Sequence, residues 1–412
     1  MRFNFIHAAD LHIDSPFAGL GGKDPAVASR FAAAGRKAVD RLVAETIDCK
    51  AAFLIVAGDV FDGDWKDVTT GLFFVRALGH LHRAGIPVFL TKGNHDADSV
   101  MSRGLTYPES ARTFDSRKAE TFTLDELRVA LHGRSFGGRK VADDFVQSYP
   151  ARREGWLNIG VLHTALDGTR GHASYAPCTA DELRRFGYDY WALGHIHAAE
   201  IIARDPWIVF PGNLQGRSVR ETGPKGAMRV TVENGRIISV EPLVLDAARW
   251  THEAIDVSGC EDEDGILALV RSRLASVHGG NDGRPLAIRL TLQGRTGHHH
   301  RLVARQGVIE DECRALAFQV AEDCWVEQVK VATTAPARAA PLAADADALD
   351  LEALLDAAAS DPSFAEVVSE LLASIREKLP HGLRDELLGG ADDAMRELTG
   401  AAHDHLLGSL PR

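Results

Sequence analysis

The chain has 412 residues, of which 45% are hydrophobic and 25% are charged. This is the composition of a globular protein of two or three domains, and it excludes a wholly disordered chain, a collagen-like chain and a disulfide-stapled miniprotein. No apolar stretch reaches the roughly 18 residues that a membrane-spanning helix needs. The first ten residues lack a secretory signal pattern, so we expect a cytoplasmic protein. The five cysteines show no CxxC spacing, which favours free thiols over disulfides or a zinc–thiolate site.

The charge is distributed unevenly along the chain. The formal net charge is −12, from 46 basic and 58 acidic residues. Residues 345–412 hold 15 acidic and 5 basic residues, a balance of −10, so the rest of the chain is near −2. The acidic excess therefore belongs to the C-terminal segment, and the remainder can still carry local basic patches for a polyanion.

Short apolar runs recur through residues 1–245. They lie at residues 3–9, 51–57, 87–91, 157–162, 190–193 and 207–210. Runs of this length are typical of buried strands. Residues 25–48 and 68–84, which separate the first three runs, have helical periodicity. Alternation of strand and helix predicts an α/β domain over residues 1–245.

The pattern changes near residue 246 to that of a small α+β domain over residues 246–331. Its expected elements are a strand at 251–257, a helix at 262–277, a strand at 285–292, a further strand near 301–304, a helix at 310–322 and a strand at 325–331. An Ala/Pro-rich linker follows at residues 332–348. Residues 349–412 carry apolar side chains at helical spacing, which predicts a C-terminal helical segment.

Polar side chains follow five of the predicted strands. They are Asp10 and His12, Asp59 and Asp62, Asn94, His95 and Asp96, His163, and His195 and His197. Taken singly, each could be a surface histidine or a turn aspartate. Parallel α/β sheets, however, bind ligands at the carboxyl ends of their strands, so five clusters at such positions favour one site.

The residue types of these clusters indicate a metal centre. Carboxylate, imidazole and amide donors without thiolate suit Mn²⁺, Fe²⁺ or Zn²⁺ better than a soft metal. The set is too large for one ion and fits two ions that share a bridging carboxylate. Two such ions, about 3.5–4 Å apart, clamp a phosphate and generate hydroxide from a bridging water.

The motifs DLH, GDVFD, GNHD and GHIH occur in this order, with a lone His before the last. This order resembles the calcineurin-like metallophosphoesterase superfamily. Within it, the stretches GDWKDVTTGLFFVRAL, AGIPVFLTKGNHDA, YDYWALGHIH and PWIVFPGNLQGR are similar to SbcD-type DNA repair exonucleases, particularly the bacterial YhaO-like branch. The resemblance is close over residues 1–245, looser over the α+β domain and weak over the C-terminal segment.

The resemblance implies a fold and a set of residue roles. The fold would be a double β-sheet sandwich flanked by helices, followed by an α+β capping domain. The metal ligands would be Asp10, His12 and His197 for one ion and Asn94, His163 and His195 for the other, with Asp59 bridging both. Mn²⁺ is the expected metal, with Fe²⁺, Zn²⁺ and Mg²⁺ left open.

The resemblance also assigns the proton transfer. His95 would protonate the leaving oxygen or stabilise its charge, and Asp62 would orient His95. Archaeal and eukaryotic relatives carry a His at the position of Asp62, which weakens any detailed transfer of the exonuclease mechanism to this chain.

Candidate DNA contacts come from basic residues near the predicted site. They are Arg134, Arg170, Arg217 and Arg220, each of which could equally lie on a solvated face. In the family, C-terminal helices dock on the coiled coil of an SMC-like ATPase. Here a helical hairpin folded back on its own domain is the alternative, and a homodimer is also left open. The run His298–His300 is predicted to be a polar loop rather than a third metal site.

The sequence therefore predicts a metal-dependent DNA phosphodiesterase, an exonuclease of DNA repair that could also cut internally. One alternative is a small-molecule phosphodiesterase or phosphatase of the same superfamily. The other is a non-catalytic scaffold that binds DNA ends. The intact ligand set argues against the scaffold, because a binding module does not need His95 and Asp62.

Overall fold

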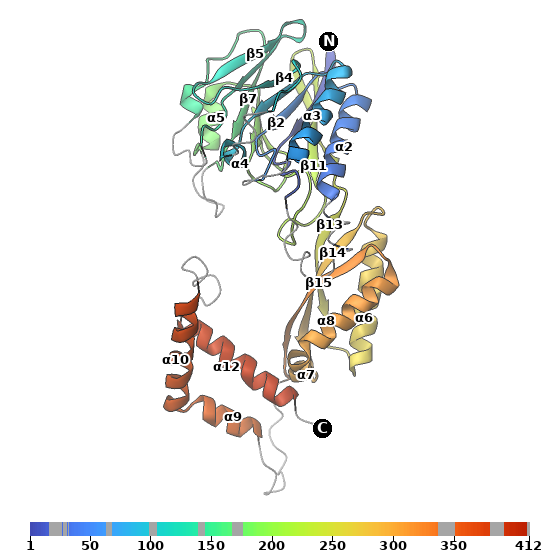
Figure 1. The fold of residues 1–412 in the computed structure, drawn as a ribbon, viewed down its shortest axis with the longest axis vertical. Coiled ribbons are helices and arrows are strands. Elements are labelled where there is room, and N and C mark those ends of the chain that lie inside the picture. The colour runs from blue at the N-terminus through green and yellow to red at the C-terminus, as the bar shows by residue number, and fades with distance from the viewer. Residues whose placement is uncertain are drawn as a thin grey trace. The chain divides into compact units, whose positions relative to one another are not determined.

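The computed structural model describes residues 1–15, 27, 31, 33–62, 68–98, 105–138, 145–166, 176–336, 351–379 and 391–409. The chain forms two compact units (Figure 1). The first comprises Met1–Thr251 with Gly283–Ala287, and the second comprises His252–Asp282 with Ile288–Arg412. The predicted double-sheet α/β fold is confirmed in the first unit, which contains two six-stranded sheets.

The first sheet has the order β12-β11-β1-β2-β3-β4. Its strands are β1 (Arg2–Ala8), β2 (Leu54–Ala57), β3 (Val88–Thr91), β4 (Ala111–Thr113), β11 (Gly226–Glu233) and β12 (Arg236–Val244). Strands β1 to β4 run parallel, with Ile6 opposite Leu54 and Leu54 opposite Val88. Strands β11 and β12 extend the sheet as an antiparallel pair. The carboxyl ends of β1, β2 and β3 therefore lie along one edge.

The second sheet has the order β5-β6-β7-β8-β10-β9. Its strands are β5 (Glu120–Leu124), β6 (Val129–Gly133), β7 (Leu157–His163), β8 (Tyr190–Gly194), β9 (Glu200–Arg204) and β10 (Trp207–Phe210). Four strands, β6, β7, β8 and β10, run parallel, and β5 and β9 are antiparallel edges. Each sheet thus has a parallel half or centre whose strand ends can carry a site.

Aromatic side chains fill the space between the two sheets. Phe5 stacks on Phe53 with ring centroids 4.7 Å apart, and Tyr190 from the other sheet meets Phe5 edge-on at 5.5 Å. Helices α2 (Ala34–Asp48) and α3 (Val68–Arg83) cover the outer face of the first sheet, and α5 (Ala180–Phe186) contributes Leu183 to the core outside the second. Shorter helices are α4 (Asn94–Asp98), η2 (Asp125–Leu127) and η3 (Val146–Ser148). The packed core between the sheets and the helices outside them hold the strands of both sheets, and therefore their carboxyl ends, in fixed positions.

The second unit contains a three-stranded sheet of order β13-β14-β15 and several helices. The elements are β13 (Arg249–Asp256), α6 (Glu263–Gly279), β14 (Leu286–Arg295), α7 (His299–Ala304), α8 (Gln306–Val320) and β15 (Cys324–Thr334). The strand expected near residues 301–304 is wrong, because these residues form the helix α7. Arg301 and Arg305, four residues apart, both pair with Glu263, which is the spacing of a helical turn.

Within its described residues, the C-terminal segment contributes three helices to the second unit. They are α9 (Leu351–Ala359), α10 (Pro362–Lys378) and α12 (Ala391–Gly408). Pro362 opens α10, and the Asp361 side chain accepts a hydrogen bond from the Ser363 amide, which is a regular helix start. No described helix is both long enough and apolar enough to cross a bilayer. All five cysteines are free, as expected.

Candidate metal centre

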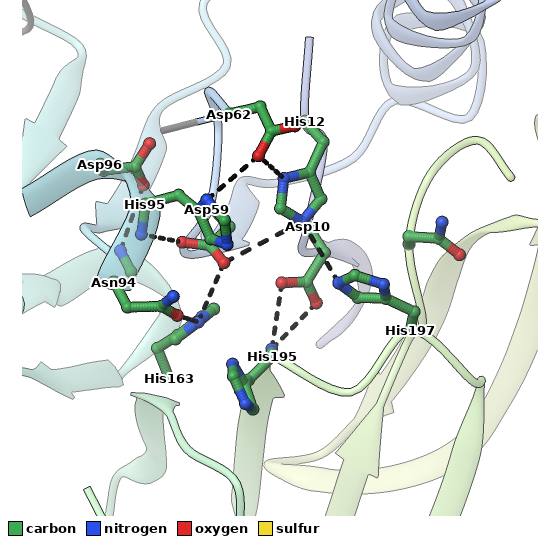
Figure 2. A network of polar contacts seen from close by, with 12 residues as sticks. Asp10, His12, Asp59, Asp62, Asn94, His95, Asp96, His163, His195 and His197 are labelled. Carbon is green, nitrogen blue, oxygen red and sulfur yellow. Dashed lines mark hydrogen bonds and ion pairs between the residues drawn. The ribbon is translucent and has the colours of Figure 1, made fainter. Parts of the chain in front are cut away.

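The polar clusters that follow β1, β2, β3, β7 and β8 meet at one place in the first unit. Figure 2 shows these side chains pointing toward one another from both sheets. The structure brings together all nine residues predicted for the metals and the proton transfer: Asp10, His12, Asp59, Asp62, Asn94, His95, His163, His195 and His197. Most are buried, so the cluster is part of the interior rather than of a solvated surface.

Asp10, His12 and His197 form one group of donors. One donor atom from each lies within 4.8 Å of the others, and the Nε2 atoms of the two histidines are 3.2 Å apart. The Nδ1 of His197 donates to Glu221 Oε1 at 2.8 Å. In the neutral ring the Nε2 of His197 is then unprotonated, and its lone pair is directed at His12. Two ring nitrogens at this distance suit a shared cation.

Asp59, His163 and His195 form a second group within the same limit of 4.8 Å. The Nδ1 of His163 donates to the Ala57 carbonyl at 2.9 Å. Its Nε2 faces two oxygens, Asp59 Oδ2 at 3.3 Å and Asn94 Oδ1 at 3.1 Å. In a neutral imidazole this nitrogen is a hydrogen-bond acceptor, and so are the two oxygens that it faces. A bound cation would satisfy all three atoms.

Asp59 lies between the two groups. Its Oδ2 is 3.3 Å from His163 Nε2 and 4.0 Å from His12 Nε2, so one carboxylate oxygen is near donors of both. Its Oδ1 accepts a hydrogen bond from the His95 amide at 3.0 Å, which fixes the carboxylate plane. This is the position that a bridging ligand needs.

The electrostatics of the centre favour positive charge. Burial raises the pKa of Asp10, because a buried carboxylate loses its hydration. Burial also acts to raise the pKa of Asp59, but His163 outweighs it and holds that pKa below its ordinary value. Burial lowers the pKa of His163, yet the nearby Asp59 reverses this and raises it to about 9. Buried carboxylates of this kind require a cationic partner, so the donor set fits divalent metal ions.

His95 and Asp62 form a pair beside Asp59. His95 Nδ1 lies 3.0 Å from Asp62 Oδ1, and the Ser15 hydroxyl donates to Asp62 Oδ2 at 2.6 Å. The hydrogen bond to Asp62 raises the pKa of His95. His12 and His95 together hold the pKa of Asp62 well below its usual range. The pair therefore favours the protonated form of His95.

Two further carboxylates support the centre, Asp96, which the sequence places in the third cluster without a role, and Glu221, which was not predicted. Asp96 accepts from the amides of Val60, Phe61 and Gly93 at 3.0–3.1 Å and so ties the β2 and β3 ends together. Burial raises its pKa to about 6. Asp96 belongs to the GNHD motif, which could have indicated a role. Glu221, which orients His197, lies outside every motif and gave no signal.

Backbone strain is concentrated in the centre. Four candidate ligands have left-handed backbone angles, at φ of 52° for Asp10, 41° for His12, 52° for Asp59 and 100° for His195. Such conformations cost about 1–3 kcal/mol each and persist where the surrounding structure imposes them. The loops are also tightly packed, since a Cβ on Gly93 would lie 2.2 Å from Asp59 Oδ1. The strand ends thus hold the donors in place before any ion binds.

The candidate DNA-binding arginines lie in different surroundings. Arg217 contacts the centre, with its guanidinium 2.9 Å from Glu221 Oε1 and 3.8 Å from Asp62 Oδ2. Arg134 stacks on the Phe145 ring at 4.2 Å. Arg220 is exposed, and Arg170 falls outside the described residues. Arg217 is therefore placed to position Glu221 and Asp62.

Comparisons with known proteins match both parts of this chain. Residues 3–199 match the family model of the calcineurin-like phosphoesterases, and residues 250–334 match that of the middle domain of the metallophosphoesterase YhaO. The first match spans the strand ends that carry nearly the whole candidate centre. The second spans β13 to β15 of the second unit.

Two individual relatives and one solved structure are similar to parts of this chain. An uncharacterized metallophosphoesterase, YhaO of Bacillus subtilis, is 34% identical over 77% of this chain and 78% of its own length. The DNA double-strand break repair protein Mre11 of Methanopyrus kandleri is 26% identical over 64% of this chain and 62% of its own. A solved dimetal phosphatase from Danio rerio is 13% identical and covers 55% of this chain and 92% of its own, with a TM-score of 0.33.

Proposed function

Because this chain belongs to the calcineurin-like metallophosphoesterase family, we propose that it is a metal-dependent DNA phosphodiesterase, an exonuclease of the SbcD type that acts in DNA repair. Membership of the family makes it a hydrolase of phosphoesters. The observation that carries the proposal is that the buried Asp59, which belongs to one donor group, also lies 4.0 Å from His12 of the other. A single shared carboxylate between two groups is the arrangement of a two-metal hydrolase.

In this proposal, Asp10, His12 and His197 would hold one ion, Asn94, His163 and His195 would hold the other, and Asp59 would be a ligand of both. When bound, the ions supply a water-derived nucleophile at neutral pH and neutralise charge on the phosphate. Mn²⁺ is the expected metal. The chain itself fixes the donors, because the Ala57 carbonyl and Glu221 hold His163 and His197 in the tautomer that directs Nε2 at the ions.

His95 acts as the proton donor to the leaving oxygen. Its Nδ1 is held by Asp62, so the protonated ring carries its other proton on Nε2. The same hydrogen bond raises the pKa of His95 and so favours the protonated ring that a proton donor needs. Ser15 and Arg217 hold Asp62 from its other side and so keep the pair oriented.

The choice of DNA as substrate has separate support. It comes from the similarity to the archaeal double-strand break repair protein and from the additional second unit, which suits a large substrate or partner. A small phosphoester of the same reaction class is the alternative substrate. The two proposed functions use the same metal centre and differ in the substrate that enters it.

The test is an assay of metal-stripped protein to which Mn²⁺ is returned. End-labelled linear double-stranded DNA and a small chromogenic phosphodiester are offered side by side, with Asp59→Ala as control. We expect Mn²⁺-dependent DNA degradation that the control lacks. Hydrolysis of the small ester with DNA untouched, both alone and with a coiled-coil ATPase partner added, would overturn the choice of substrate but not the phosphodiesterase. Failure on both substrates would overturn the activity.

The C-terminal helices complete the proposal as a docking site for a coiled-coil ATPase of the SMC type. Along α10, Phe364, Val367, Leu371 and Ile375 form an exposed apolar stripe at helical spacing, while Leu372, about 100° further round the helix, is buried. An amphipathic helix with such a stripe fits the seam of a partner helix. Co-purification with the ATPase should be lost in Leu371→Asp and kept in the matched Glu370→Gln. Self-association that Leu371→Asp abolishes, without ATPase binding, would instead indicate a homodimer.

A further inference from the structure

A second set of metal-binding side chains lies in the second unit. His299 and His300 open helix α7, and Asp404 lies on α12, about a hundred residues later in the chain. One donor atom from each of the three lies within 4.8 Å of the others. Among the described residues, the same arrangement is found only in the two donor groups of the candidate metal centre in the first unit, which is called the strand-end centre below. The three residues are called the α7–α12 cluster below.

The distances within the α7–α12 cluster suit a single ion. Asp404 Oδ2 is 3.1 Å from His299 Nε2, and its Oδ1 is 3.0 Å from His300 Nδ1. Tetrahedral Zn²⁺ with ligands at 2.0–2.2 Å separates its donors by roughly 3.3 Å. Small side-chain rotations would therefore bring one carboxylate oxygen and both imidazoles to bonding distance of one ion.

The surroundings support His299 as a ligand. Its other ring nitrogen, Nδ1, lies 2.9 Å from the hydroxyl of Thr333, which is buried on β15. Metal-bound histidines are commonly oriented by such a partner on the second nitrogen, which fixes the tautomer and the ring plane. A hydrogen bond from Nδ1 to Thr333 leaves the Nε2 lone pair directed at Asp404.

Neighbouring charges do not oppose a cation at this position. Arg301 and Arg305, the basic residues of the same helix turn, pair with Glu263 of α6 at 2.5 and 2.7 Å. The side chains of the cluster are 13% exposed for His299, 27% for His300 and 25% for Asp404, so an ion can enter from solvent. Partial burial also strengthens its attraction to the carboxylate.

The backbones of α7 and α12 are in close contact at the cluster. A Cβ on Gly408 would lie 2.0 Å from the His300 carbonyl oxygen, so only glycine allows this approach. His298 is the N-cap residue of α7 and its Nε2 donates to the Glu261 carbonyl, whereas His299 and His300 form the first helical turn. The polar loop expected from the sequence is therefore wrong for these two residues.

From this geometry we propose that His299, His300 and Asp404 bind a divalent cation, with Zn²⁺ the best fit, and that the ion fastens α12 to α7. Imidazole and carboxylate donors without thiolate suit Zn²⁺ among the common ions. An ion that binds the docked helix and not the undocked one stabilises docking by mass action. Zn²⁺ would thus control how firmly the C-terminal helices are held on the second unit.

The first experiment counts bound Zn²⁺ in full-length protein that carries no histidine tag. Zinc content is measured after equilibration and desalting for the wild type, Asp404→Asn and His405→Gln. We expect Asp404→Asn to hold one ion fewer than the wild type, whatever number the strand-end centre holds. His405→Gln, which removes an exposed imidazole from the same helix, should match the wild type. Equal zinc in wild type and Asp404→Asn would leave a hydrogen-bonded His–Asp pair and overturn the proposal.

The second experiment measures docking directly, by hydrogen–deuterium exchange of α12 with and without Zn²⁺. Zn²⁺ should slow exchange in the wild type and leave Asp404→Asn unchanged. Thr333→Val should weaken Zn²⁺ binding at the cluster by about 10- to 100-fold, as is usual for loss of an orienting partner. His299→Gln serves as a second ligand variant if Asp404→Asn does not fold. Protection of α12 by Zn²⁺ in the ligand variants as well would contradict the fastening.

Discussion

The strand-end centre and the α7–α12 cluster bring histidine and aspartate together by different means. In the first, five strand ends from two sheets place the donors, four of them on left-handed backbone, in the interior of a sandwich. In the second, two neighbouring residues of a short helix meet one residue of a distant helix at a partly exposed contact. The first arrangement is imposed by the core, whereas the second exists only while two helices stay docked. A rigid centre suits catalysis, and a separable one suits a fastening.

The largest expected effect comes from removing the carboxylate shared by the two donor groups. Asp59→Asn should lower phosphodiester hydrolysis by about 10³-fold or more, above the 10- to 100-fold typical of an outer partner, because in the proposed mechanism both ions would lose a charged ligand. Metal content and initial rates with Mn²⁺ measure this. The α7–α12 cluster should keep its Zn²⁺ in this variant, and loss of that ion too would show that the two sites are not independent.

His95→Asn separates proton transfer from metal binding within the strand-end centre. The rate should fall by about 10²-fold or more, because the leaving oxygen loses its proton donor. Bound metal should stay at the wild-type level, since His95 belongs to neither donor group. His80→Asn removes an imidazole that belongs to no candidate site, and it is the matched control. Unchanged hydrolysis in His95→Asn would remove this residue from the mechanism.

Glu221→Gln tests whether the strand-end centre depends on a residue that orients one of its donors. In the α7–α12 cluster the corresponding residue is Thr333. Glu221 accepts from His197 Nδ1, so the amide should weaken metal affinity by about 10- to 100-fold while leaving the fold intact. Metal titration of the stripped protein measures this. Glu241→Gln, an exposed carboxylate paired with Arg229, should bind metal as the wild type does. Equal affinities in both variants would assign Glu221 a structural role with Arg217.

The sequence could predict the strand-end centre because each donor follows an apolar run in a recognisable motif. The six predicted strands of the first unit are present, and their carboxyl ends meet as expected. The strands β4, β5, β6, β9, β11 and β12 were not predicted. Most of them are partly exposed or carry interspersed polar residues and so lack a continuous apolar run, and in the buried β6 the apolar run is only three residues long before His132 and Gly133. Glu221 and Asp404 could not be found either, because their partners lie far away in the chain and no local period marks a contact between loops or helices.

The smallest expected effect concerns two buried histidines of the same sandwich. Asp59 raises the pKa of His163 to about 9, whereas burial without a carboxylate lowers that of His7 to about 3. His7 stays neutral between the Tyr190 hydroxyl at 3.0 Å and the Leu193 carbonyl at 3.2 Å. As the pH falls below about 6.5, the His7 imidazole is protonated in the unfolded chain before it is protonated in the folded protein. Acid therefore favours unfolding. The stability is complete above that pH and is lost toward pH 3.

This loss is measured as the difference between urea unfolding at pH 7 and at pH 5, in EDTA so that metal release does not contribute. His7 should account for about 2 kcal/mol of the decrease, because its unfolded pKa lies about 1.5 units above pH 5. His7→Gln should lack that component, whereas His252→Gln, on the exposed side of β13, should keep it. If His7→Gln lost as much stability as the wild type, the acid sensitivity would arise elsewhere, and burial alone would not separate His7 from His163.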